Sequence, residues 1–139
     1  MAQQDYILRM IEMAGQALIR LRRRLLGQEA DPAEVEDELR QIAGRSSLDL
    51  DFLRSVSLDT LVLLVSPAGE PEPGRTWITA ELFLVDGLRS EAVGDPEGAR
   101  ACYERALRLY ALLDPGIVAR GMPEVAERVE EVRGRLEAL

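Results

Sequence analysis

Apolar residues recur at alternating spacings of four and three along the first 26 positions of the chain. This repeat is typical of an amphipathic helix that packs against another helix. Its members are Ile7, Ile11, Ala14, Leu18, Leu21 and Leu25. A second stripe beside it consists of Leu8, Gly15, Ile19 and Leu26. We predict a helix over residues 4–26 with a wide apolar face, closed by Gly27 in a left-handed C-terminal cap.

A second helix start follows at Asp31-Pro32, because Asp caps a helix N-terminus and Pro suits its first turn. This helix is expected to end at Gly44. Its inward positions are Val35, Leu39 and Ile42.

Two short helices are predicted at 48–56 and 58–65, the second capped by Ser57. Residues 60–65 could instead form a buried strand, but the chain offers no second strand to pair with it. Residues 66–75 contain three prolines and two glycines, so we predict an exposed linker loop there.

The second half of the chain is predicted to hold three more helices. The first covers 76–93 with Thr76 as its cap, the next covers 96–113 with Asp95 as its cap, and the last begins near residue 123. The inward positions of the first are Ile78, Leu82, Val85 and either Leu88 or Ala92. Two exposed ion pairs are expected on the last helix, Glu124 with Arg128 and Glu131 with Arg135.

These elements predict an all-α fold of about five to seven helices, arranged as an array of helical hairpins. At 139 residues the chain is expected to form one domain, residues 1–139. Within it, residues 1–65 hold the N-terminal helices, residues 66–75 the linker loop, and residues 76–139 the remaining helices.

The segment Gly94-Asp95-Pro96-Glu97-Gly98-Ala99, with Tyr103 and Ala106-Leu107 after it, resembles the second helix of a tetratricopeptide repeat. Gly87 falls where that family places a small residue on the preceding helix, which would let Ala99 pack closely against it. Asp86 and Ser90 depart from the family pattern, which has apolar residues there. The match covers roughly 40 residues, about one repeat. It implies a helical hairpin with a groove that holds peptides.

The opening Asp5-Tyr6-Ile7-Leu8-Arg9-Met10-Ile11-Glu12 is similar to the start of a family of uncharacterised bacterial helical proteins. The members of this family have a repeat-like C-terminal half. The resemblance implies the same all-α layout and brings no catalytic residues.

Missing residue types narrow the chemistry. The chain has no His, Lys or Asn, so it has no imidazole base, no Schiff-base lysine and no His metal ligand. The lone Cys102 cannot form an intrachain disulfide or a multi-thiolate zinc site, and we expect a small buried side chain there. Acidic clusters in 34–38 and 124–131 are expected to be solvated helix faces. We therefore expect no metal and no cofactor.

The net charge of −8 opposes nucleic-acid binding. Residues 1–26 nevertheless carry five Arg against two carboxylates, a net of +3. Arg20, Arg23 and Arg24 with Arg22 could form a docking patch for an acidic partner. The alternative, which we favour, is that they complement the helix C-terminus and the protein's own acidic helices.

No basic-then-apolar leader opens the sequence, and its apolar runs are too short to span a bilayer. A cytoplasmic protein that neither spans a membrane nor binds nucleic acid is therefore expected, in line with the single cysteine.

Three aromatic residues are candidates for lining the hairpin groove: Trp77, Tyr103 and Tyr110. Burial in the core is the alternative, and we favour it for the two tyrosines.

No catalytic constellation is present, so we expect a non-enzymatic protein-interaction module with an unidentified protein partner. The alternative is a small ligand-binding protein or enzyme that uses Arg and carboxylate groups in a helical pocket. The width of the first helix's apolar face also predicts a homodimer, with Gly15 allowing close approach of the second copy.

Overall fold

Helices account for the regular structure of the part of the chain described here. The computed structural model describes residues 2–114 and 123–139, with side chains from Arg9 onward, and contains no strand in those ranges. Its seven helices are α1 (Ala2–Leu26), α2 (Pro32–Arg45), α3 (Leu50–Ser55), α4 (Leu58–Leu64), α5 (Pro73–Ala92), α6 (Pro96–Tyr110) and α7 (Val125–Ala138). The predicted all-α fold is therefore confirmed.

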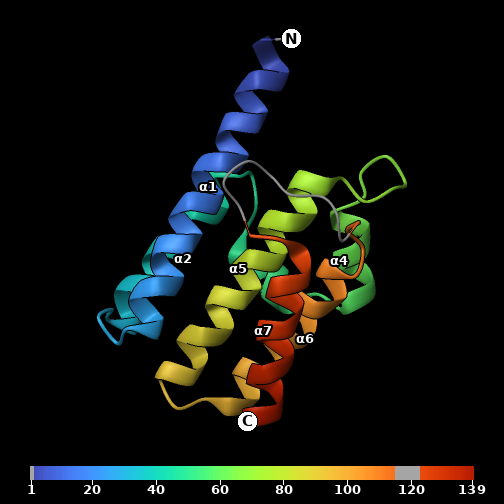
Figure 1. The fold of residues 1–139 in the computed structure, drawn as a ribbon. Helices are drawn as coiled ribbons and strands as arrows, with labels where there is room; N and C mark the ends of the chain where they lie inside the picture. The colour runs from blue at the N-terminus through green and yellow to red at the C-terminus, as the bar shows by residue number, and fades with distance from the viewer. Residues whose placement is uncertain (1, 115–122) are drawn as a thin grey trace.

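Helix α5 lies at the centre of the arrangement (Figure 1). Helices α1 and α2 pack on one side of it, and α6 packs on another side. Helix α7 packs against α6. The short helix α3 contacts α2, and α4 contacts α6. Helices α5 and α6, which follow one another in the chain, form the most extensively packed pair. The tetratricopeptide-like arrangement of these helices stays a prediction.

The central helix is buried on every side from Thr76 to Leu88. The sequence pattern predicted a single inward face, but a helix with neighbours all round has no wet face. Ala92, the alternative inward position, is exposed. Two of the buried residues are charged, Glu81 and Asp86, which are 2% and 1% exposed. Buried charges need partners, and this need determines how the outer helices attach to α5.

Capping residues define most of the helix starts. The side chains of Asp31, Ser57 and Asp95 accept backbone N–H groups at the starts of α2, α4 and α6, as predicted. The start of α5 was predicted wrongly. The Glu72 side chain caps it, so the helix begins at Pro73, and the connection from α4 is shorter than the expected 66–75. Thr76 instead donates its hydroxyl to the Glu72 carbonyl.

Two contacts of glycine residues also differ from expectation. The left-handed residue after α1 is Gln28, with φ of 55°, and not Gly27. Gly87 faces the ring of Tyr103 rather than Ala99, and a Cβ at Gly87 would overlap that ring. Ala99 is itself fully buried. The small residue on α5 therefore makes room for an aromatic ring at the α5–α6 crossing.

Candidate functional site

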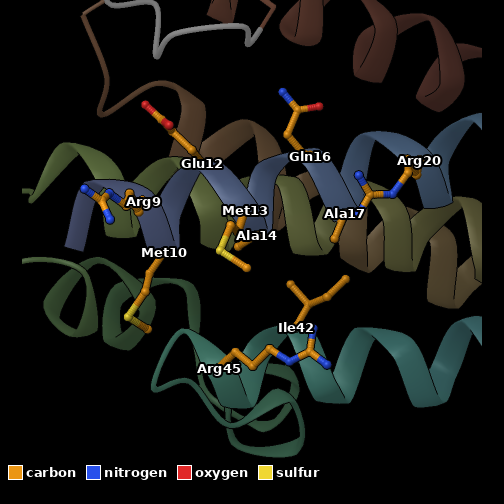
Figure 2. A pocket seen from close by; sticks show the side chains of 10 residues that line it. All are labelled: Arg9, Met10, Glu12, Met13, Ala14, Gln16, Ala17, Arg20, Ile42 and Arg45. Atoms are coloured by element: carbon orange, nitrogen blue, oxygen red, sulfur yellow. The ribbon is translucent and has the colours of Figure 1, made fainter. Parts of the chain in front are cut away.

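An open groove of about 890 Å³ runs between α1 and α2. Residues at helical spacing on α1 form most of its lining, and α2 contributes two residues from its last turn (Figure 2). Its apolar lining residues are Met10, Met13, Ala14, Ala17 and Ile42. Positions 10, 13, 14 and 17 share one side of a helix because they follow its 3.6-residue period.

The methionines make this groove unlike the rest of the α1 surface. Ala14 and Leu18 are buried in the core, whereas Met13 is 68% exposed. Met13, with the half-buried Met10 one turn before it, thus forms a short apolar strip beside the buried seam of α1. Exposed apolar side chains that line a concavity are typical of interaction surfaces. Methionine suits such a surface because its unbranched, polarisable side chain adapts to the partner's shape.

Three guanidinium groups surround the apolar strip. They belong to Arg9 and Arg20 on α1 and to Arg45 on α2. None of them forms an ion pair with a carboxylate in the described part of the chain, which is rich in carboxylates. Glu12 also borders the groove, but its side chain leaves α1 on the side away from α2 (Figure 2). The groove is therefore apolar at its centre and positive at its edges.

The arginines predicted to form a cluster at the end of α1 divide into two that form ion pairs and two that do not. Arg22 pairs with Glu131 of α7 at 2.7 Å, and Arg24 pairs with Glu38 of α2 at 3.1 Å. These two arginines complement the protein's own acidic helices, which is the interpretation we favoured from the sequence. Arg20 borders the groove, and the exposed Arg23 has no ion pair among the described residues.

The three aromatic candidates lie in the core. Trp77 is 6% exposed, Tyr103 is fully buried and Tyr110 is 1% exposed. Tyr103 donates its hydroxyl to Glu91, and Tyr110 donates to Glu81. Burial of the tyrosines is confirmed, and none of the three offers a surface to a partner. None of the three lines the concavity that the structure has between α5 and α6.

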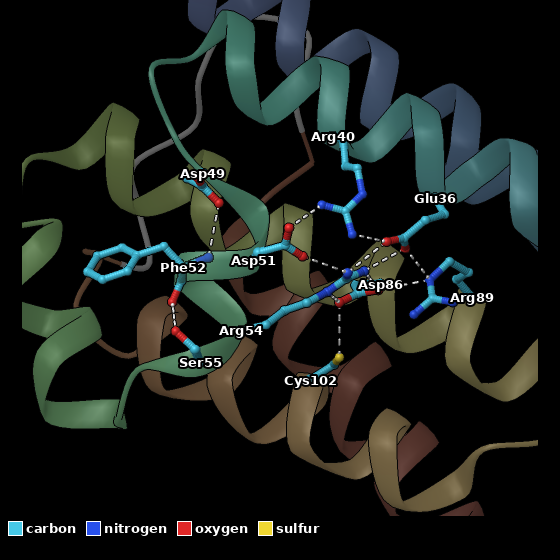
Figure 3. A network of polar contacts seen from close by, with 10 residues as sticks. All are labelled: Glu36, Arg40, Asp49, Asp51, Phe52, Arg54, Ser55, Asp86, Arg89 and Cys102. Carbon is cyan, nitrogen blue, oxygen red and sulfur yellow. Dashed lines mark hydrogen bonds and ion pairs between the residues drawn. The ribbon is translucent and has the colours of Figure 1, made fainter.

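A second concavity, of about 270 Å³, lies where α3, α5 and α6 meet. Arg54 of α3 lines it and hydrogen-bonds both Glu36 of α2 and Asp86 of α5 (Figure 3). Arg89 contacts the same two carboxylates, at 3.2 Å and 3.0 Å. Arg40 also pairs with Glu36, at 2.8 Å. Arginine and carboxylate groups do converge here, but they form ion pairs with one another.

The lone cysteine borders this second concavity. The Cys102 thiol donates to Asp86 across 3.4 Å. Burial, followed by the charge of Asp86, raises the pKa of the Cys102 thiol to about 12. A thiol must ionise to act as a nucleophile, so Cys102 is a buried donor here. Of the two carboxylates that line the concavity, Asp86 pairs with Arg54 and Arg89, and Asp95 accepts the Gly98 N–H as the cap of α6.

A third polar cluster crosses the core. Arg128 of α7 contacts both oxygens of Glu81 on α5, at 3.1 Å and 3.2 Å, and reaches Glu131 at 3.3 Å. Glu131 continues the chain of charges to Arg22 on α1. The expected exposed pairs Glu124–Arg128 and Glu131–Arg135 are therefore wrong, because both Arg128 and Glu131 turn inward.

The described residues contain no group of three or more His, Cys, Asp or Glu arranged to hold a metal ion. Among those same residues, no helix is long and apolar enough to cross a membrane. Comparison of the chain with known protein families, curated proteins and solved structures found no match.

Sequence reasoning found one edge of the groove, Arg20, and missed its centre. Met10 and Met13 were passed over because they lie outside the two apolar stripes of α1. Their position was the available signal: two methionines three residues apart on a helix whose seam is already complete. Ile42 and Arg45 had no such signal, since the groove exists only once α2 is packed beside α1.

Proposed function

We propose that this chain is a non-enzymatic protein-binding module and that the groove between α1 and α2 is its binding surface. The observation that carries the proposal is the exposed Met13 beside the half-buried Met10, bordered by three guanidinium groups without ion pairs in the described residues. Binding a partner there would cover the apolar side chains and supply the missing carboxylates. We place the protein in the cytoplasm, as the sequence predicted.

A ligand-binding protein or enzyme that uses Arg and carboxylate groups is the less favoured candidate. Its site would be the cluster around Arg54. Glu36 and Asp86 there are each held by at least one arginine, and Arg54 spans the two. Asp95, which also lines the concavity, caps α6 by accepting the Gly98 N–H. A substrate would have to break several of these pairs before it could bind.

The homodimer stays a prediction, but the surface of α1 that could form its interface differs from the stripe expected from the sequence. Gly15 is buried, and Ile19 is half-buried against the protein's own core. Leu26 is 39% exposed. Met13 is the most exposed of the described large apolar side chains of α1, at 68%, so a second copy that packs on α1 would have to use the groove.

The proposal is tested by comparing Met13→Asp with Leu63→Asp. Leu63 on α4 is a matched control, because it is 71% exposed against 68% for Met13 and lies outside the groove. Tagged proteins expressed in the native source should retain the same partner for wild type and Leu63→Asp and lose it for Met13→Asp. Circular dichroism should show that all three fold. Equal retention by both variants would refute the groove as the binding surface.

A further inference from the structure

We infer that the partner presents an amphipathic helix with Asp or Glu on both sides of its apolar face, and that this helix lies in the α1–α2 groove. This inference rests on the proposed function and adds the chemistry of the partner to it. It follows from the shape of the groove, the spacing of its arginines and the side chains at its centre.

A helix fits this groove better than an extended peptide. An extended peptide that binds by strand addition needs an exposed sheet edge, and the described residues form no strand. A proline-rich extended peptide docks in an aromatic-lined groove, and the described residues that line this one include no aromatic side chain. A helix satisfies its own backbone groups and needs only an apolar seat. Two helices packed side by side leave a seat for a third along their common groove.

The groove is long enough for about three helical turns. Arg9 and Arg20 are eleven residues apart on α1, which corresponds to about 16 Å at 1.5 Å per residue. Eleven residues are also close to three whole turns, so both arginines lie on the same side of α1. A partner helix of about 11 residues would therefore span from one arginine to the other across Met10 and Met13.

The arginines determine the charge of the partner. Arg9 and Arg20 lie on the side of the groove that α1 forms, and Arg45 lies on the side that α2 forms (Figure 2). A helix between them meets positive charge on both flanks, and carboxylates there would form charge-assisted hydrogen bonds. The chain's overall negative charge does not prevent this, because salt screens charges beyond about 8 Å. The apolar centre argues against a nucleic-acid phosphate backbone, which would leave the methionines uncovered.

A second copy of this chain fits less well. A two-fold interface places the same patch on both partners, so arginines would face arginines. The acidic helices α2 and α7 could supply carboxylates, but their apolar residues are already in the core. Buried residues of this kind outside the groove are Val35 and Leu39 on α2 and Val125 and Val132 on α7.

The test is a displayed library of 18-residue helical peptides. Their apolar face varies among Leu, Ile, Met and Phe, and their flanking positions vary among Asp, Glu, Gln, Lys and Arg. Selection on the wild-type chain should enrich Asp and Glu at the flanks. The selected peptides should lose binding to Met13→Asp. They should bind the double variant Arg20→Glu/Arg45→Glu at least about tenfold more weakly and Arg100→Glu unchanged, since Arg100 is exposed on α6 and unpaired among the described residues.

The outcomes separate the two proposals. Peptides that need Met13 but carry neutral or basic flanks would overturn the acidic partner and leave the protein-binding groove standing. Selected peptides that bind Met13→Asp as tightly as wild type would overturn both. A wild-type chain that sediments as a dimer, with Met13→Asp a monomer, would assign the groove to a second copy and overturn the acidic partner.

Discussion

Three arginines converge on the carboxylate of Glu36. Arg54 contacts it at 2.7 Å, Arg40 at 2.8 Å and Arg89 at 3.2 Å. The hydrogen bond from Arg54 is the main reason that the pKa of Glu36 falls from its ordinary 4.5 to about 2, against the opposing effect of partial burial. Glu36 thereby ties α2 to both α3 and α5 in its ionised form.

Glu36 makes the protein less stable in acid. A lowered folded-state pKa gives stability that is fully present above pH 4.5 and is lost as the pH falls toward 2. We expect a loss of about 1–2 kcal/mol from this group after solvent screening. Urea unfolding at pH 7 and pH 3 should show a smaller loss for Glu36→Gln than for wild type. The exposed Glu104→Gln should follow wild type, and a Glu36→Gln chain with the full acid loss would contradict the assignment.

Gly87 and Gly134 are a matched pair of helix glycines in different surroundings. A Cβ at Gly87 would overlap the ring of Tyr103, whereas a Cβ at Gly134 would meet no atom within 4 Å. We expect Gly87→Ala to cost about 1–3 kcal/mol through overpacking. Gly134→Ala should gain about 0.5–1 kcal/mol from helix propensity. Chemical denaturation checks both, and equal effects would show that Gly87 is not at a tight crossing.

The burial of a single residue was predictable where it depends only on the residue's position on one helix face. Ala14, Leu18, Leu21 and Leu25 are buried as the seam of α1 requires. Asp86 was recognised only as a departure from the repeat pattern, because its partner Arg54 lies 32 residues away and on a short helix. Periodicity along one helix contains no information about charges on another.

Helix α7 is attached to the core through a charged side chain. Arg128 is buried and holds Glu81 of α5, which also accepts the hydroxyl of Tyr110 from α6. Burial raises the pKa of Glu81, in opposition to Arg128 and Tyr110. One arginine thus connects α7 to the two helices of the hairpin.

Replacing Arg128 alone should lower the free energy of unfolding more than replacing both Arg128 and Glu81. Arg128→Met leaves Glu81 buried without its cation, and we expect a loss of about 3–5 kcal/mol. Glu81→Met/Arg128→Met should recover part of that loss, although the Tyr110 hydroxyl is then unpaired. Arg133→Met, at an exposed position of α7, is the control and should change little. If urea denaturation gave a loss for the double variant equal to the sum of the losses for Arg128→Met and Glu81→Met, the coupling of the pair would be contradicted.

At the scale of elements, helix starts were predictable when a preferred cap precedes proline. Asp31-Pro32 and Asp95-Pro96 both mark true starts. Glu72-Pro73 marks a third, but glutamate is not among the preferred caps, and the surrounding prolines and glycines favoured a loop. The complete burial of α5 was also missed, since it depends on how α1, α2 and α6 gather around it.

Charge is unevenly distributed over the whole molecule. The chain has a net charge of −8, yet the side formed by α1 and the end of α2 presents Arg9, Arg20 and Arg45 around an apolar groove. Other arginines, including Arg22 and Arg54, are taken up by the protein's own carboxylates. This distribution favours an acidic partner at one side of the molecule.

Salt should weaken that binding in a characteristic way. Exposed ion pairs are screened, whereas apolar contact is not. The affinity of an acid-flanked helical peptide is expected to fall between 50 mM and 500 mM NaCl, and the fall should shrink for Arg20→Glu/Arg45→Glu. Fluorescence anisotropy measures both. An equal salt dependence in the two proteins would mean that these arginines do not contact the peptide.

The central claim is that a partner helix lies on Met10 and Met13, and the methyl spectrum of methionine-labelled protein tests it most directly. Of the four methionines, these two line the groove, and Met1 and Met122 lie outside the described residues. Met10→Leu and Met13→Leu assign their signals. Adding an acid-flanked peptide selected on the wild-type chain is expected to shift both signals in proportion to the bound fraction. Binding that is seen by anisotropy on the same sample, with both signals unmoved, would contradict the account.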